Sequence, residues 1–128
     1  MPCRHDAFLQ ELGRLVKVLF VCTYNRMRSP TAEMLYRGRS DLEVRSAGVA
    51  PDAIVPVTEE LLQWAETVFA MDAGHRLYLQ THFFSTWGGA KRIECLDIPD
   101  LFHYMNPELV RILTEKLRPY LGEPMLEP

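Results

Sequence analysis

The chain has 128 residues, of which 48% are apolar and 24% are charged, and its formal net charge is −3. This length and composition predict one soluble domain over residues 1–128, with residues 1–14 as a lead-in and residues 122–128 as a tail. The negative net charge excludes a general attraction to nucleic acid or to an anionic membrane, so any affinity for anions must be local.

Three cysteines occur, Cys3, Cys22 and Cys95, and none has C-x-x-C spacing. This argues against a disulfide framework and a structural zinc site, and the histidines form no metal-binding spacing either. We therefore expect no metal, no cofactor and a reducing, cytoplasmic location. The charged N-terminal residues and the lack of a long apolar run predict neither a signal peptide nor a membrane span.

Apolar patterning and capping signals predict strands that alternate with helices. A short helical lead-in is expected at residues 6–12. Strands are expected at residues 18–22, 42–45, 67–71 and 92–98. Helices are expected at residues 30–39, from Thr58 onward, from Asp72 to about residue 83 with Leu77 and Leu79 among its apolar positions, and from Asn106 until Pro119 stops the helix. Residues 52–56 and 85–90 are expected to be loops.

This alternation predicts an α/β three-layer sandwich with a central four-stranded parallel sheet. In such folds the ligand site lies outside the carboxyl ends of the strands. Four polar residues follow the predicted strand ends: Cys22, Ser46, Asp72 and Asp100.

Residues 18–22 form an apolar run that is typical of a parallel strand buried on both faces. Ser29 suits a helix N-cap and Pro30 suits the first helical position. The chain should therefore turn from strand to helix across residues 23–28. This turn would place the Cys22 sulfur close to a helix N-terminus.

The backbone N–H groups of such a loop and the positive end of the helix favour an anion at one point. The same field stabilises a thiolate at Cys22, while the fork of Arg28 can hold two oxyanion oxygens. A lone cysteine that ends a buried strand is ordinarily a core residue, but its combination with Arg28 and Pro30 favours a functional loop. We predict that phosphate is bound by Thr23, Tyr24, Asn25, Arg26, Met27, Arg28 and Ser29.

The segment from Val21 to Glu33 resembles the signature V-C-x5-R-S-P-x-A-E of the low-molecular-weight protein tyrosine phosphatases. Further similarities follow in the family's order: Ser46-Ala47-Gly48, Val68-Phe69-Ala70-Met71-Asp72 and Asp97-Ile98-Pro99-Asp100. The resemblance spans residues 17–120 and implies a sheet with the strand order 2-1-3-4.

The resemblance also implies a phosphatase that hydrolyses phosphotyrosine proteins or small aryl phosphates through a phosphocysteine on Cys22. An aspartate would protonate the departing phenol and then activate the water that releases phosphate. Arg28 and the loop amides would stabilise the equatorial oxygens. Ser29 would donate a hydrogen bond to the thiolate, and Asn25 and Ser46 match family positions that brace the loop.

The general acid is predicted to be Asp100 rather than Asp97. The alternation of the fourth strand continues through Asp97, whereas Pro99 ends ladder hydrogen bonding and frees Asp100 to project from a loop. The aspartate of the family's corresponding loop is usually followed by proline, whereas Leu101 follows Asp100 here.

The chain departs from the family pattern in three places. Met27 stands where many members have a second cysteine, Tyr24 replaces a usual glycine, and the segment between residues 48 and 58 is short. Two other functions are therefore left open. One is an arsenate reductase, which needs resolving thiols and would have only Cys95 and Cys3. The other is a weakly catalytic module that binds phosphate or phosphopeptides.

Overall fold

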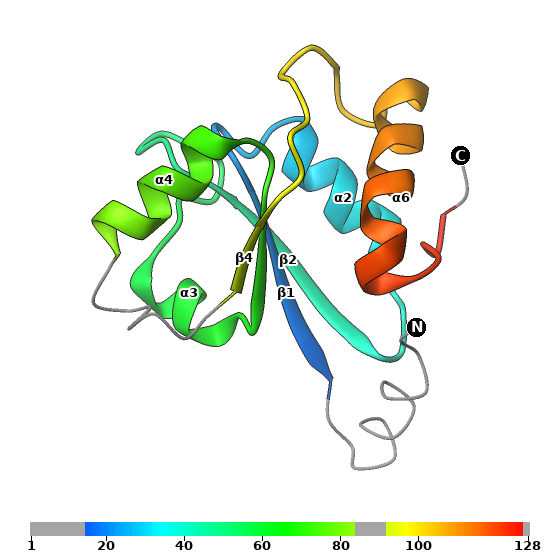
Figure 1. Ribbon diagram of the computed structural model, residues 1–128, viewed down its shortest axis with the longest axis horizontal. Helices are drawn as coiled ribbons and strands as arrows, with labels where there is room; N and C mark the ends of the chain where they lie inside the picture. The colour runs from blue at the N-terminus through cyan, green and yellow to red at the C-terminus, as the bar shows by residue number, and fades with distance from the viewer. Residues whose placement is uncertain (1–14, 84–91, 127–128) are drawn as a thin grey trace.

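The computed structural model describes residues 15–83 and 92–126 (Figure 1). Its elements are β1 (Val16–Cys22), α2 (Arg28–Tyr36), β2 (Leu42–Gly48), α3 (Glu59–Trp64), β3 (Thr67–Ala70), α4 (Ala73–His82), β4 (Arg92–Cys95) and α6 (Pro107–Leu121). The predicted lead-in helix, the predicted loop at residues 85–90, and Cys3 lie outside the described residues.

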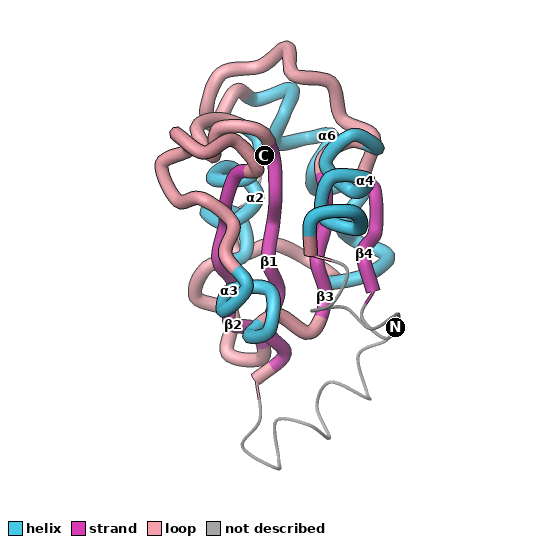
Figure 2. The backbone as a smooth tube through the Cα atoms, turned by 90° about the vertical axis from the view of Figure 1, so that its left-hand side faces the viewer, coloured by secondary structure: helices cyan, strands magenta, loops and turns pink. Residues whose placement is uncertain are grey.

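The four strands form one parallel sheet in the order β2-β1-β3-β4, and Figure 2 shows them side by side. β1 pairs with β2 from Val16 opposite Leu42 to Cys22 opposite Gly48. β3 pairs with β1 on one side and with β4 on the other. The predicted fold class and strand order are confirmed, and all four carboxyl ends lie at one edge of the sheet.

Helices cover both faces of the sheet, with α2 and α6 on one face and α3 and α4 on the other (Figure 1). Successive β1 side chains point to opposite faces. Phe20 therefore joins Leu113 of α6 in one core, while Val21 joins Leu79 of α4 in the second. Burial on both faces explains why the β1 sequence is continuously apolar.

Two helices differ from their predicted forms. On α4, Leu79 is fully buried, but Leu77 is 61% exposed and is not part of the core. α6 does not stop at Pro119 but continues to Leu121, which is buried. Proline deprives only one carbonyl of its helical partner, here that of Glu115, which is an exposed residue.

The first residues of the predicted tail, 122–126, are held against α2. The Tyr36 hydroxyl donates a hydrogen bond to the Gly122 carbonyl (2.8 Å), and the Met125 N–H donates to the Leu35 carbonyl (2.7 Å). The Arg39 guanidinium donates to the Glu123 carbonyl (2.9 Å). These contacts make the segment part of the folded unit.

β2 also extends further than predicted, to Gly48, so Ser46 lies within the strand rather than after it. None of the helices in the described part of the chain combines the length and the apolar character required to cross a membrane.

Candidate active site

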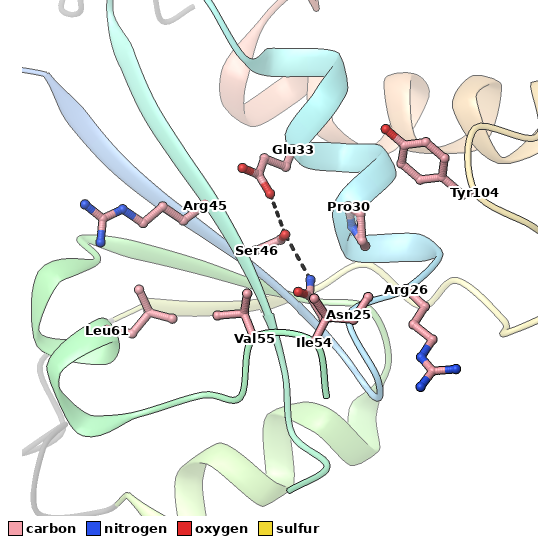
Figure 3. Close-up of a pocket in the computed structure, with 10 residues that line it drawn as sticks. All are labelled: Asn25, Arg26, Pro30, Glu33, Arg45, Ser46, Ile54, Val55, Leu61 and Tyr104. Carbon is pink, nitrogen blue, oxygen red and sulfur yellow. Dashed lines mark hydrogen bonds between the residues drawn. The ribbon is translucent and has the colours of Figure 1, made fainter. Parts of the chain in front are cut away.

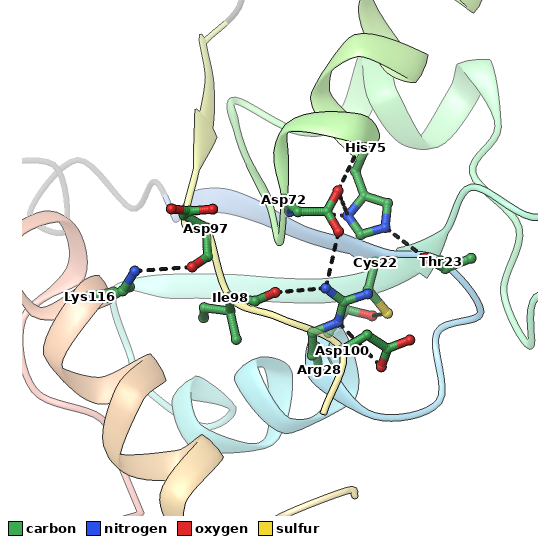
Figure 4. Close-up of polar contacts among 10 residues, drawn as sticks. Cys22, Thr23, Arg28, Asp72, His75, Asp97, Ile98, Asp100 and Lys116 are labelled. Carbon is green, nitrogen blue, oxygen red and sulfur yellow. Dashed lines mark hydrogen bonds and ion pairs between the residues drawn. The ribbon is translucent and has the colours of Figure 1, made fainter. Parts of the chain in front are cut away.

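Cys22 is the last residue of β1, and its side chain lines a pocket at the carboxyl edge of the sheet (Figure 4). The pocket has a volume of about 250 Å³ and is lined by Cys22, Thr23, Tyr24, Arg26, Met27, Arg28 and Asp100. The Ser29 Oγ lies 3.0 Å from the Cys22 Sγ, where its hydroxyl can donate to a thiolate. The predicted nucleophile, arginine and acid therefore share one pocket.

The carbonyl groups of the loop after β1 are bound by the segment that follows β2. The carbonyl oxygens of residues 22–24 accept hydrogen bonds from the N–H groups of Val49, Ala50 and Ile54, at 3.0, 2.9 and 3.1 Å. Within a trans peptide the C=O and N–H point in opposite directions, so the next N–H groups point away from that segment. No N–H of residues 23–27 donates a hydrogen bond to another described residue. These donors are available to an anion.

Two backbone features allow the segment after β2 to lie close to the loop after β1. A Cβ atom at Gly48 would lie 2.5 Å from the Thr23 carbonyl oxygen and 2.9 Å from the Asn25 nitrogen, so the position has room only for glycine. Asn25 has a φ of 58°, a left-handed conformation that asparagine tolerates better than most residues. Tyr24 replaces a family glycine without strain of this kind, because the positive φ falls on Asn25.

The buried Asn25 side chain connects the loop after β1 to α2 and β2 by hydrogen bonds. Its Nδ2 donates hydrogen bonds to the Ser29 Oγ and to the Ser46 Oγ, both at 2.9 Å. The Ser46 hydroxyl donates in turn to the carboxylate of Glu33 (Figure 3). The structure thus brings together the predicted bracing residues and adds Glu33, which the sequence analysis did not assign to the site.

Ser29 is not the helix N-cap that the sequence predicted. α2 begins at Arg28 with Met27 at the N-cap, and no described side chain caps it. Pro30 is accordingly the third helical residue rather than the first. The Ser29 hydroxyl is instead occupied by Cys22 and Asn25. Because no side chain takes the first N–H groups of α2, they remain available to a bound anion.

The Arg28 side chain is 2% exposed and is oriented by oxygen atoms of three residues from two segments (Figure 4). Its Nη1 donates to the Ile98 carbonyl (2.8 Å) and to the Asp72 carboxylate (3.3 Å). Its Nε lies 3.8 Å from the Asp100 Oδ1. Since Ile98 and Asp100 belong to the loop after β4, Arg28 joins that loop to residues 23–27, which we call the phosphate loop.

Asp72 is the N-cap of α4 and forms a capping box with His75, as the predicted helix start requires. Burial opposes ionisation of Asp72, but the hydrogen bond from the His75 backbone N–H and the charge of Arg28 outweigh it and lower the pKa of Asp72. The carboxylate is therefore a stable anionic partner for Arg28.

Asp100 lines the pocket, whereas Asp97 points away from Arg28 (Figure 4). The predicted strand at residues 92–98 ends earlier, at Cys95. Asp97 has a φ of 58° and is exposed, and its carbonyl accepts a hydrogen bond from the Lys116 Nζ at 3.2 Å. Asp100, and not Asp97, therefore lines the pocket that contains Cys22 and Arg28.

His75 contacts the phosphate loop, which the sequence analysis did not anticipate. The ring is buried, and its Nε2 lies 2.8 Å from the Thr23 Oγ1. The available signal was the spacing Asp72-x-x-His75, since the third helical residue of a capping box turns its side chain back toward the N-cap.

The outer wall of the pocket is formed by Tyr24, Arg26 and Met27. Tyr24 is 47% exposed, and the Arg26 guanidinium carbon lies 6.0 Å from the centroid of its ring. A larger pocket of about 580 Å³ lies on the α2 and β2 side of the loop (Figure 3). Its lining includes Asn25 and Arg26 but not the Cys22 nucleophile, so size alone would select the wrong pocket.

Cys95 ends β4 and is separated from β1 by β3. Neighbouring strands lie about 4.8 Å apart, so Cys95 and Cys22 are about 10 Å apart across the sheet. A disulfide needs Cα atoms closer than about 7 Å, and this pair therefore cannot form one in this fold. In residues 15–83 and 92–126 there is also no cluster of three or more His, Cys, Asp or Glu that could hold a metal ion.

No protein-family model matches the chain. The chain is similar to a protein-arginine-phosphatase of Bacillus subtilis (strain 168), with 33% identity over 93 residues. The matched region is 52% of this chain and 62% of that relative, less than two thirds of its length.

Two solved structures share the fold. An arginine phosphatase from Geobacillus stearothermophilus matches with a TM-score of 0.62 and 25% identity, over 83% of this chain and 92% of that one. A low molecular weight protein tyrosine phosphatase from Streptococcus pyogenes matches with a TM-score of 0.69 and 16% identity, over 84% of this chain and 92% of that one. The chain thus shares the fold of the low-molecular-weight protein tyrosine phosphatases. This confirms the resemblance carried by the segment from Val21 to Glu33.

Gly48→Ala should weaken the binding of orthovanadate. The new methyl group would meet backbone atoms of Thr23 and Asn25, and overpacking of this kind costs about 1–3 kcal/mol, on the order of 5- to 150-fold in affinity. The control is Gly38→Ala, since Gly38 has a φ of 95° but only the Met125 methyl group, at 4.0 Å, near its Cβ position. Gly38→Ala should lower the melting temperature and leave vanadate affinity unchanged. Equal affinity of Gly48→Ala and unmodified protein would contradict the loop geometry.

Proposed function

We propose that this protein is a cysteine-dependent phosphatase that hydrolyses phosphotyrosine-type aryl phosphate monoesters. The observation that carries the proposal is one pocket that combines the Cys22 sulfur, N–H groups without described partners, and the Arg28 guanidinium. The matched relative and solved structures named above are phosphatases. A thiol nucleophile must stay reduced, which supports a cytoplasmic location.

In the first step the Cys22 thiolate attacks phosphorus, and the S–P bond forms as the P–O bond to the phenol breaks. The phenol oxygen takes the electron pair and receives the proton that Asp100 carries. The loop N–H groups and Arg28 stabilise the charge on the equatorial oxygens, because they are fixed before the substrate arrives.

In the second step water attacks the phosphocysteine and gives a proton to the Asp100 carboxylate. The P–S bond breaks, the electron pair returns to Cys22, and inorganic phosphate leaves. The Ser29 hydroxyl, 3.0 Å from the sulfur, donates a hydrogen bond that stabilises the departing thiolate. Cys22 is then again a thiolate and Asp100 again carries a proton, as at the start of the cycle.

Arg28 can bind phosphate while it keeps its own hydrogen bonds. Ile98 and Asp72 both bind its Nη1. Among the contacts of the described residues, Nε and Nη2 have no hydrogen-bond partner, so this edge of the guanidinium is available to two phosphate oxygens.

The mouth of the pocket favours an aryl leaving group. The exposed Tyr24 ring lies at the wall. A neighbouring pocket of about 380 Å³ adds apolar surface beside the acid, and it is lined by Met27, Asp100, Leu101, Phe102 and His103. Aromatic and apolar side chains of this kind suit a phenyl ring next to a group that donates a proton.

Phosphoarginine is the second candidate substrate, because the Bacillus subtilis relative is a protein-arginine-phosphatase. The Asp100 carboxylate could pair with a departing guanidinium. Arg26 opposes this reading, since it places a positive charge in the same pocket wall. The arsenate reductase alternative has no support from Cys95, which lies too far across the sheet from Cys22 to resolve it directly.

Asp100→Asn should lower kcat/KM for phosphotyrosine by roughly 10²–10⁴-fold, because the phenol would leave without a positioned acid. The loss should be small for an aryl phosphate whose leaving group needs no proton. Comparing kcat/KM restricts the test to the steps up to phenol release. Asp97→Asn is the matched control and should leave both values nearly unchanged. A selective defect in Asp97→Asn alone would show that the acid is misassigned.

Arg26→Ala should shift substrate preference toward phosphoarginine. A like charge at the exposed rim costs about 1 kcal/mol, roughly a fivefold change in the ratio of kcat/KM values for matched phosphoarginine and phosphotyrosine peptides. Arg45→Ala is the control, since Arg45 lines only the larger neighbouring pocket and stacks on Trp64 at 4.3 Å. If unmodified protein already prefers the phosphoarginine peptide, the proposed substrate class is wrong.

A further inference from the structure

His75 has two hydrogen bonds that together fix its tautomer. The Asp72 backbone N–H, which can only donate, lies 3.2 Å from the His75 Nδ1. Nδ1 must therefore be the unprotonated acceptor, and the ring proton lies on Nε2. Nε2 lies 2.8 Å from the Thr23 Oγ1, so the ring donates to this hydroxyl. The two bonds require the neutral ring.

These bonds connect two parts of the site that are far apart in the sequence. Thr23 is the first residue of the phosphate loop; its carbonyl is held by Ala50, and its side chain is held by His75. The His75 backbone N–H donates to the Asp72 Oδ1 (3.1 Å), while the other oxygen of that carboxylate faces Arg28. A single buried residue thus contacts both the anion-binding loop and the partner of the phosphate-binding arginine (Figure 4).

We propose that neutral His75 is a positioning residue that holds the Thr23 end of the phosphate loop and the Asp72 partner of Arg28 in register, and that protonation of its ring weakens anion binding. A proton on Nδ1 would face the Asp72 N–H and break that hydrogen bond. The Nδ1–H would turn instead to the Asp72 Oδ1, 3.3 Å away, which now accepts from the His75 backbone. The capping box and the loop would both be disturbed.

Burial favours the neutral form of the ring at physiological pH. Burial lowers the pKa of His75 below its ordinary value of 6.5, and Arg28 of α2 adds to the lowering. Asp72, on its own helix, and Asp100, in the loop after β4, act in the opposite direction. An unfolded chain takes up a proton near pH 6.5, above the pH at which the folded protein does. The contribution of neutral His75 to the stability of the folded protein is therefore fully present above pH 6.5. It is lost as pH falls toward the lowered pKa of His75.

The test is orthovanadate affinity of the full chain measured from pH 5 to pH 8. His75→Ala removes both ring contacts and should weaken vanadate binding by about two- to tenfold near pH 8, the range of one net hydrogen bond. His75→Gln keeps an acceptor for the Asp72 N–H at the capping position and an amide donor for Thr23, so it should restore most of the affinity. His82→Ala, an exposed change on the same helix, should leave affinity unchanged.

The pH dependence separates positioning from a merely structural role. The ratio of unmodified to His75→Gln affinity cancels every titration that the two proteins share, and it should fall at the acid end of the range, as pH approaches the lowered pKa of His75, because glutamine does not titrate there. Thr23→Val and His75→Ala should also be non-additive when combined. A folded His75→Ala with normal affinity, or a ratio that is constant with pH, would overturn the proposal.

The inference on regulation of this site rests on the proposed function, but the two can fail separately. Vanadate binding by unmodified protein without turnover of any phosphate ester would remove the proposed function and leave the His75 proposal standing. A flat affinity ratio with normal phosphatase activity would remove the His75 proposal alone. Unmodified protein that does not bind vanadate would overturn both.

Discussion

The hydrogen bonds between the loop after β1 and the segment after β2 determine what the rest of the site can do. Val49, Ala50 and Ile54 bind the loop carbonyls and so leave the N–H groups of the loop for an anion. This arrangement depends on parallel pairing of β1 with β2, which brings Cys22 opposite Gly48, and on the absence of a side chain at Gly48. An anion site is thereby built from backbone alone, and side-chain chemistry is added to it.

Arg28 connects that backbone site to Asp100, the proposed acid. Its guanidinium is buried, and such a charge is tolerated only when its donors are satisfied. Ile98 and Asp72 accept hydrogen bonds from its Nη1, and the edge formed by Nε and Nη2 suits a phosphate. Because Ile98 lies two residues before Asp100, the same contact sets the distance between the acid and the phosphate site. Displacement of the loop after β4 would therefore affect phosphate binding and proton transfer together.

Local sequence signals were sufficient for the alternation of strands and helices and for the loop that carries Cys22 and Arg28, whereas the strand order came from the family resemblance. They failed where a side chain had a long-range alternative. Ser29 has the identity of an N-cap, but Cys22 and Asn25 engage its hydroxyl. Leu77 fits the apolar pattern of α4, yet it remains 61% exposed. The role of His75 depends on a contact with Thr23, 52 residues away, which capping patterns do not specify.

The most direct test of the account is to trap the phosphoenzyme. Asp100→Asn should form it readily from p-nitrophenyl phosphate, whose leaving group needs little protonation, and should hydrolyse it slowly because the water lacks its base. After rapid denaturation, mass spectrometry of the digested protein should find phosphate on the peptide that contains Cys22, and not in a double variant that also carries Cys22→Ala. Phosphate on a different residue, or steady phosphate release from Cys22→Ala, would contradict the assignment of Cys22 as the nucleophile.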